Sequence, residues 1–305
     1  MTSARRIVVA INPQAAFGKH ASLGETVINR LRSENFSIEI VQGIDFEDAR
    51  TQLARVLTPE DALLVVGGDG MVSMAVNLVA ERGIPFAVMP GGTGNDFARG
   101  LGMPVDDLHA CLDLTVAALR SQARPIDLAR VRSAHESAGN RGVFYACVLS
   151  AGFDAFVNER ANRMRWPRGR SRYTWSILFE LVGLRARPYE LTVDGATRHE
   201  QAVLISVANN RNMGGGMIIT PEASITDGLL DVFIVKPVTR FRLLRLLPSV
   251  FKGEHVSEPE VVIERARKVR LDSPGIVGYA DGERLSSLPL EVEVVPGAAL
   301  LLSAD

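Results

Sequence analysis

The chain has 305 residues, enough for about two domains, and its 47% apolar and 23% charged residues are typical of a folded globular protein. This composition excludes a disordered or fibrous chain. The 34 Lys and Arg residues nearly balance the 35 Asp and Glu residues, so no overall attraction to nucleic acid is expected, and only a local patch could supply one. Two cysteines, Cys111 and Cys147, are too few for a disulfide framework, and we expect a reducing, cytoplasmic setting.

The apolar stretches are short. Residues 1–6 are polar, and Ile7–Ile11 is too brief for the core of a signal peptide, so no export signal is expected. The longest stretch without a charge, Gly83–Asn95, has 13 residues with two prolines and four glycines. A helix that spans a bilayer needs about 20 apolar residues. We therefore expect a chain that does not cross a membrane but could rest on one.

The first third of the chain alternates short apolar runs with helical patterns. Residues 23–31, 49–56 and 72–79 carry apolar positions at helical spacing. The strand-like runs are Ile7–Ile11, Ser37–Val41, Ala62–Val66 and Phe86–Met89. Strands that alternate with helices predict an α/β domain with a mostly parallel sheet covered on both faces. We place this domain at residues 1–127.

After about Asp127 the pattern changes to strands that follow one another. The runs are Val143–Leu149, Glu190–Val193, Ala202–Val207, Leu230–Val235, Val261–Ile263 and Leu290–Val295. A helical, arginine-rich insertion interrupts them from about residue 155 to 184. The pattern predicts a β-rich, sandwich-like second domain over residues 128–305. The final apolar run, Ala298–Leu302, could pack back on either domain.

The first loop that could carry chemistry is Asn12–Lys19, between a strand end and a helix. Backbone amides at such a junction suit an anion. The loop is not a P-loop, because it lacks the leading glycine and the Ser or Thr after Gly18-Lys19. A plain strand-to-helix turn is the alternative.

Two further loops follow neighbouring predicted strands. Gly67–Gly70 contains Asp69, and Pro90–Arg99 contains Thr93, Asn95 and Asp96. Glycines let a backbone approach a ligand closely, and the carboxyl ends of parallel strands are the usual ligand side of such a sheet. The two aspartates are therefore expected at one edge, as in a nucleotide and metal site. Helix capping is the alternative for these polar residues, and capping and ligation can coexist.

Two Asp-Gly turns lie far along the chain. Asp281-Gly282-Glu283 and Thr226-Asp227-Gly228 are, in isolation, hairpin turn signals and no more.

Taken together, these motifs resemble the diacylglycerol kinase catalytic-domain family, which includes bacterial lipid kinases and sphingosine and ceramide kinases. The resemblance covers most of the chain, and its most specific segment runs from Gly92 to Phe97. The glycine-aspartate loop alone also occurs in NAD kinases and phosphofructokinases. The motifs in family order are Asn12-Pro13, Gly67–Gly70, Gly91–Ala98, Thr226–Gly228 and Asp281–Glu283.

The resemblance implies ATP and Mg²⁺ as cofactors, with the nucleotide in a cleft between the two domains. Asp69 and Asp96 would organise Mg²⁺ and the phosphates, and Glu283 would be the general base for a lipid hydroxyl. A second, structural Mg²⁺ would be held by the carboxylate of Asp227 and the carbonyls of Ser224 and Leu229. The positions implied for nucleotide binding are Asn12, Gly68, Asp69, Gly70, Thr93 and Asn95.

The chain departs from the family pattern at four positions. Met71 replaces a usual threonine, Met74 replaces a common glutamate, and Ala15 and Ala16 replace a serine and a glycine. Met71 offers no hydroxyl, and Ala16 takes a left-handed backbone only at a cost. These changes could weaken nucleotide binding, whereas the retained Asp69, Asp96 and Glu283 favour an active enzyme.

An acid-free stretch crowds six arginines beside Trp166, with Tyr173 and Trp175 next in the chain. Such a stretch suits an anionic membrane surface; a solvated helix face or a polynucleotide site is the alternative. The arginines are Arg160, Arg163, Arg165, Arg168, Arg170 and Arg172.

The leading hypothesis is an ATP-dependent lipid kinase, a phosphotransferase with an alcohol acceptor, that converts diacylglycerol to phosphatidic acid. It would be cytoplasmic with peripheral membrane contact through residues 160–172 and without a nucleic-acid partner. Related bacterial enzymes suggest a homodimer. The alternatives are a kinase for a sphingoid base, a polyprenol or NAD, and a nucleotide- or lipid-binding regulator with weakened catalysis.

Overall fold

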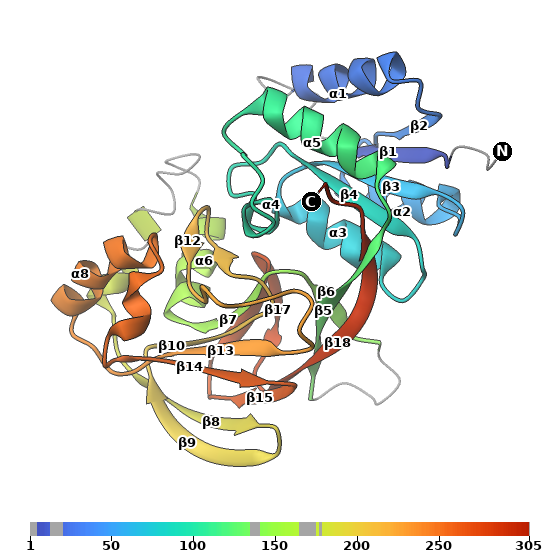
Figure 1. Cartoon of the computed structure of the whole chain (residues 1–305). Helices are drawn as coiled ribbons and strands as arrows, with labels where there is room; N and C mark the ends of the chain where they lie inside the picture. The colour runs from blue at the N-terminus through green and yellow to red at the C-terminus, as the bar shows by residue number, and fades with distance from the viewer. Residues whose placement is uncertain (1–4, 13–20, 135–140, 165–174, 177–178, 305) are drawn as a thin grey trace. The chain divides into compact units, whose positions relative to one another are not determined.

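The computed structural model describes residues 5–12, 21–134, 141–164, 175–176 and 179–304 (Figure 1). The chain divides into two compact units. The first comprises Met1–Leu128 together with Pro296–Asp305, and the second comprises Ala129–Val295. The last ten residues thus belong with the amino-terminal part of the chain. Each unit is described by itself below.

The first unit is built on a parallel sheet. Its strands lie in the order β2 (Ile38–Val41), β1 (Ile7–Ile11), β3 (Ala62–Gly67) and β4 (Pro85–Pro90). The end of β18 (Leu290–Leu301) joins β4 in parallel through Leu300 and Leu301. Three of these strands, β1, β3 and β4, are buried along their whole length, as expected of a parallel sheet covered on both faces.

Helices cover both faces of this sheet (Figure 1). Helices α1 and α5 pack on the face that presents Ile7, Val9 and Val66, and α2 and α3 lie on the other side. Helix α3 is apolar on most of its surface and correspondingly buried. The helix bounds are α1 Ala21–Ser33, α2 Phe46–Val56, α3 Asp69–Val79, α4 Asp96–Gly100 and α5 Leu108–Arg120.

The second unit is a sandwich of two antiparallel sheets. One sheet has the order β14 (Val261–Ala266), β13 (Leu230–Val235), β10 (Leu204–Ala208), β7 (Val148–Gly152), β16 (Val277–Ala280), β17 (Glu283–Ser287). The other has the order β18, β15 (Lys268–Asp272), β8 (Arg187–Val193), β9 (Ala196–Ala202), and β5 (Arg124–Ser133) pairs with β18 and with β6 (Val143–Tyr145).

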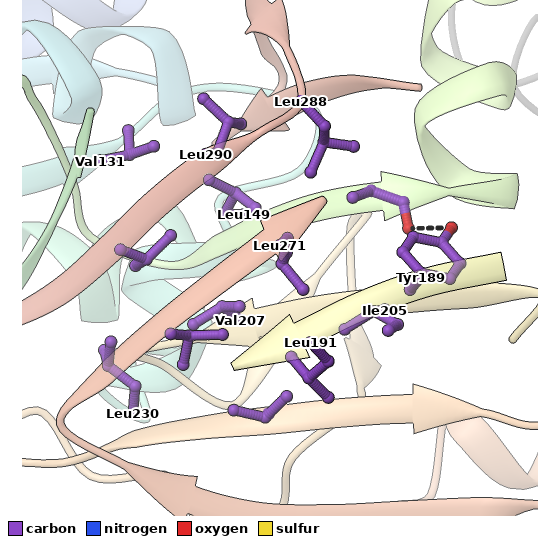
Figure 2. Close-up of a cluster of buried hydrophobic side chains, with 14 of the residues drawn as sticks. Val131, Leu149, Tyr189, Leu191, Ile205, Val207, Leu230, Leu271, Leu288 and Leu290 are labelled. Atoms are coloured by element: carbon purple, nitrogen blue, oxygen red, sulfur yellow. Dashed lines mark hydrogen bonds between the residues drawn. The ribbon is translucent and has the colours of Figure 1, made fainter. Parts of the chain in front are cut away.

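The core of the second unit lies between these two sheets (Figure 2). Leu149 and Val207 come from the first sheet, and Leu191 and Leu271 come from the second. The buried Tyr189 hydroxyl donates a hydrogen bond to the Ala151 carbonyl, at 3.2 Å, so its polar atom is satisfied inside the core. The predicted α/β domain and β-rich domain are both confirmed.

Several sequence predictions of single elements were wrong in detail. The run Val143–Leu149 is two strands, β6 and β7, and the run Ala202–Val207 contains the end of β9 and the start of β10. The helical character predicted for the arginine-rich insertion is confirmed in its described residues, which contain α6 (Phe153–Arg163) and helical residues at 175–176 and 179–182.

Other elements of the second unit were not predicted from the sequence. These are α8 (Arg240–Val250), the short η2 (Glu254–Ser257), and the hairpin of β11 (Asn212–Met213) and β12 (Met217–Ile218). Within the described ranges, no helix has both the length and the apolar character that a bilayer span requires.

Candidate active site

Asn12 and the loops after β3 and β4 meet at the carboxyl edge of the parallel sheet. Asn12, at the end of β1, donates its backbone N–H to the Val66 carbonyl at 3.2 Å. Gly91, after β4, donates its N–H to the Gly67 carbonyl at 2.8 Å. Asn12 and the loops after β3 and β4 therefore lie side by side, as the strand order β1-β3-β4 requires.

The loops after β3 and β4 touch through two glycines. A Cβ atom on Gly92 would come within 2.4 Å of the Gly68 Cα, and one on Gly68 within 2.9 Å of the Gly92 Cα. Only residues without side chains can approach so closely. Gly68 is also the N-cap of α3 and has no side chain to cap the helix, so the first amides of α3 are not occupied by a cap. Such amides suit a phosphate group.

The carboxylates of Asp69 and Asp96 converge above Gly94. The Asp69 Oδ1 atom accepts the backbone N–H of Asp96 at 2.6 Å. An ideal Cβ position on Gly94 lies 2.5 Å from the Asp69 Oδ2 atom and 3.6 Å from the Asp96 Oδ2 atom. Burial raises the pKa of the Asp69 carboxyl, and hydrogen bonds from the backbone of residues 95–97 partly oppose this rise.

This pair of carboxylates offers the hard oxygen ligands that Mg²⁺ prefers. Two carboxylates that approach the same point beside Gly94 fit a metal that keeps waters and phosphate oxygens as its other ligands. Among the described residues, no group of three or more His, Cys, Asp and Glu side chains could hold a metal by itself. The residues therefore fit a shared metal–nucleotide site better than a closed protein cage.

Asn95 supports the loop in which it lies. Its Oδ1 atom accepts the Gly92 N–H at 2.8 Å, and its Nδ2 atom donates to the Gly92 carbonyl at 2.9 Å. The residue is buried and takes a left-handed backbone with φ 56°, which Asn tolerates better than most residues. Thr93 is exposed at the tip of the same loop. Contact of either side chain with a nucleotide stays a prediction.

The two methionines that depart from the family pattern belong to the core. Met71 is 2% exposed and Met74 is 4% exposed. A Cβ on Gly67 would come within 2.6 Å of the Met71 Cγ atom, so Met71 packs directly beneath the loop after β3. Ala15 and Ala16 lie outside the described residues.

In the second unit, Asp281 organises the turn that precedes Glu283. Asp281 and Gly282 have φ of 48° and 85°, as a two-residue type I′ hairpin turn requires. The Asp281 carboxylate accepts the backbone N–H groups of Ala146, Cys147 and Val148 at 2.8, 3.0 and 3.0 Å. These bonds interrupt the predicted strand 143–149. The Asp-Gly pair signalled the turn, but nothing in the sequence signalled these three bonds.

Glu283 is the first residue of β17 and is exposed. It follows the Asp281-Gly282 turn and pairs with Ala280 of β16. Its backbone position is therefore held by the sheet and by the bonds of Asp281.

The loop from Ser224 to Leu229 contains the predicted second metal site. The Asp227 Oδ1 atom accepts the Leu229 N–H at 3.0 Å, and its Oδ2 atom lies 4.0 Å from the Arg265 Nη1 atom. The buried Asp231 lies 3.7 Å from the Arg265 Nε atom. Burial raises the pKa of the Asp231 carboxyl to about 6, and the neighbouring charge of Asp227 adds to the rise. A carboxylate and nearby carbonyls suit Mg²⁺. The two carboxyl groups of Asp227 and Asp231 outnumber the single cation of Arg265, so this loop favours binding of a cation.

Part of the arginine-rich stretch belongs to the described residues. Arg160 forms an ion pair with Glu180 at 2.5 Å and lies over the ring of Phe179. Trp175 is 48% exposed. The side chain of Arg163 and the whole of Arg165, Trp166, Arg168, Arg170, Arg172 and Tyr173 lie outside the described residues.

The predicted site residues are divided between the two units. Asn12, Gly68, Asp69, Gly70, Thr93, Asn95 and Asp96 belong to the first unit, and Ser224, Asp227, Leu229 and Glu283 belong to the second. Within the first unit the structure brings the predicted residues together at one sheet edge.

Comparison with known proteins agrees with the fold of the two units. The family model of the diacylglycerol kinase catalytic domain matches residues 6–131, and that of the YegS C-terminal NAD kinase beta sandwich-like domain matches residues 147–303. A diacylglycerol kinase of Mycobacterium tuberculosis is 38% identical over 301 residues, covering 97% of this chain and 94% of that protein. The chain therefore belongs to the diacylglycerol kinase family.

Solved structures show the same fold at lower identity. A putative diacylglycerol kinase from Bacillus anthracis superposes with a TM-score of 0.74 and 21% identity, covering 100% of this chain and 98% of that one. An NAD kinase from Archaeoglobus fulgidus in complex with ATP has a TM-score of 0.52 and 12% identity, covering 98% and 93%. Membership of a kinase family implies ATP as the phosphoryl donor.

Proposed function

We propose that this protein is an ATP-dependent lipid kinase that transfers the γ-phosphate to the hydroxyl of diacylglycerol and produces phosphatidic acid. The observation that carries the proposal is the convergence of the Asp69 and Asp96 carboxylates above Gly94, beside the Gly68–Gly92 contact. The relative with 38% identity, itself named a diacylglycerol kinase, supports the choice of lipid.

Phosphoryl transfer depends mainly on positioning and on neutralising charge. The glycine loops would present backbone amides to the phosphates, and Asp69 and Asp96 would hold Mg²⁺. Bound Mg²⁺ would neutralise charge on the phosphate oxygens. The Asp69 side chain is already oriented by the Asp96 N–H, so its position does not depend on the nucleotide.

Glu283 would accept the proton of the lipid hydroxyl as general base. Its exposed carboxylate can meet a substrate from solution, and the Asp281 turn restricts its backbone. The product of this step is an alkoxide-like oxygen that attacks the γ-phosphorus as the leaving nucleotide departs.

The proposal includes three further features. A structural Mg²⁺ would bind the Asp227 carboxylate with the carbonyls of Ser224 and Leu229. The arginines of residues 160–172 would contact an anionic membrane, and the protein would act as a homodimer at the cytoplasmic membrane surface.

The test is a phosphate-transfer assay with purified full-length protein, ATP and Mg²⁺. The acceptors are diacylglycerol, a sphingoid base, a polyprenol and NAD, and NAD is included because NAD kinases share the fold. We expect transfer to diacylglycerol above the other acceptors. Transfer of phosphate to NAD alone would show that the acceptor is a nucleotide and not a lipid. Binding of ATP without transfer to any acceptor would favour the alternative of a nucleotide- or lipid-binding regulator with weakened catalysis.

A further inference from the structure

Helix α8 belongs to an unusually long connection between two paired strands. Val235 at the end of β13 pairs with Val261 at the start of β14, so the chain leaves and re-enters the sheet at neighbouring positions. Hairpin loops usually have two to five residues. Here residues 236–260 form α8 and η2 at one end of the sandwich (Figure 1).

Helix α8 has one buried face and one exposed apolar face. Leu243 and Leu246 are buried and attach the helix to the unit. Phe241 is 86% exposed, Leu244 is 39% exposed, and Phe251, immediately after the helix, is 52% exposed. These positions recur at helical spacing, so they lie along one side. An exposed patch that contains two phenylalanines is costly in water and indicates a binding surface.

The charged residues of the connection that precede η2 are all cations. Residues 236–253 contain five cations and no acid. Arg242 is paired with Glu258 and Glu260. Arg240, Arg245 and Lys252 are exposed and have no acid partner among the described residues. Arg240 even lies in the first turn, where the helix dipole disfavours a cation. Glu254, on η2, is the exposed acid next along the chain.

We propose that this face of α8 docks the protein on the surface of a bilayer that contains anionic phospholipid. Phe241, Leu244 and Phe251 would enter the boundary between head groups and acyl chains, and Arg240, Arg245 and Lys252 would bind the anionic head groups. The aliphatic Leu244 beside the two rings favours an acyl-chain boundary over a single-stranded nucleic acid, because base stacking uses aromatic side chains. The docking role takes its lipid context from the proposed function, but it concerns a different surface.

The experiment is flotation of the full-length protein with vesicles of phosphatidylcholine alone and with added phosphatidylglycerol, in the absence of nucleotide. We expect binding only to the anionic vesicles. Phe241→Ser should weaken binding about tenfold because an exposed ring no longer enters the interface. Changing Arg240, Arg245 and Lys252 together to Gln should weaken binding about fivefold per cation at low salt, and the loss should shrink as salt rises.

Matched control variants show whether vesicle binding depends on the face of α8 or only on losing an exposed apolar residue or three cations anywhere. Ile44→Ser removes an apolar residue that is 89% exposed in the first unit, and the triple change of Arg32, Arg55 and Arg267 to Gln alters the net charge equally. Both controls should bind vesicles like the wild type. Phe241 is almost fully exposed, so its replacement should leave the fold intact. If the triple variant does not fold, vesicle binding by Phe241→Ser alone tests the proposal.

Wild-type vesicle binding by Phe241→Ser would overturn the proposal. The proposal would also be overturned if light scattering showed that Phe241→Ser converts a dimer to a monomer while vesicle binding stays unchanged. The exposed face of α8 would then be a contact between two copies of this chain. The kinase proposal is tested separately with a water-dispersed short-chain diacylglycerol. In this assay the turnover of Phe241→Ser should equal that of the wild type if α8 acts only in docking. Reduced turnover of the dispersed substrate would contradict a role limited to docking.

Discussion

The Asp69 carboxylate rests on Gly94, where an added Cβ would stand 2.5 Å from the Asp69 Oδ2 atom. A contact this short forces the carboxylate or the loop to move, so Gly94→Ala should displace Asp69 from its place above the loop. We expect a loss of turnover of about 10²-fold, because a misplacement of about 1 Å in a positioning group has that effect. Steady-state kinetics at several Mg²⁺ concentrations measures it.

The control for this change is Gly183→Ala, where a Cβ would meet only the Glu180 carbonyl at 3.6 Å, an ordinary contact. It should keep wild-type turnover. If Gly94→Ala were folded and as active as Gly183→Ala, the position of Asp69 would not matter for the reaction.

Asp281 should act on the reaction by positioning Glu283. Asp281→Asn keeps the left-handed turn but loses the charge that accepts three buried N–H groups. We expect unfolding to become easier by about 1–3 kcal/mol. Turnover should also fall, with little change in the KM for ATP. Chemical denaturation and kinetics below the unfolding transition measure these two effects.

A second turn of the same geometry provides the control. Asp194 and Gly195 have φ of 47° and 89°, and the Asp194 carboxylate accepts the N–H groups of Arg267 and Lys268. Asp194→Asn should lower stability without lowering turnover. Equal turnover losses in the two variants would reduce Asp281 to a general structural role.

The pH dependence of stability should include a contribution from Asp61. The hydrogen bonds from Arg6, supported by those from Thr58, lower the pKa of this buried carboxyl to about 2. A lowered pKa contributes stability above the unfolded value near 4, and this stability is lost as the pH falls toward 2. Asp61→Asn should therefore cost about 1–2 kcal/mol at pH 7, and the difference should disappear toward pH 2. Urea unfolding at several pH values measures it, and a constant difference would contradict the account.

The loop at Asp227 should respond to Mg²⁺. If its carboxylate binds the ion, Mg²⁺ stabilises the folded protein in proportion to the logarithm of its concentration above Kd. Asp227→Ala should then lower Tm in Mg²⁺ and flatten the dependence of Tm on Mg²⁺ concentration. Glu222→Ala, which removes a largely exposed acid near the same Arg265, is the control. If the Tm of Asp227→Ala depended on Mg²⁺ concentration as that of the wild type does, the carboxylate of Asp227 would not be a Mg²⁺ ligand.

Continuous apolar runs made much of the fold predictable. Ile7–Ile11 and Leu230–Val235 are strands with the bounds that the sequence indicated, because buried strands need apolar residues throughout. The grouping of Asp69 with Asp96 was also predictable, since parallel strands end at one edge.

Other features depend on contacts between distant residues. The break between β6 and β7 requires the carboxylate of Asp281, more than a hundred residues away. The loop-supporting role of Asn95 requires its left-handed backbone, which no spacing of residues reveals. Helix α8 was missed because arginines and Pro248 interrupt an apolar pattern whose exposed half does not belong to the core.

We propose that Asp69 and Glu283 serve one phosphoryl transfer in different roles, and a comparison of Glu283→Gln with Asp69→Asn tests this most directly. ATP binding by calorimetry in Mg²⁺ and turnover of diacylglycerol are measured for both. A base contributes about 10²–10⁴-fold, so Glu283→Gln should lose turnover by that factor and keep wild-type ATP affinity, whereas Asp69→Asn should lose both. A folded Glu283→Gln protein that binds ATP and phosphorylates diacylglycerol at the wild-type rate would contradict the account, and Asp96 would become the next candidate for the base.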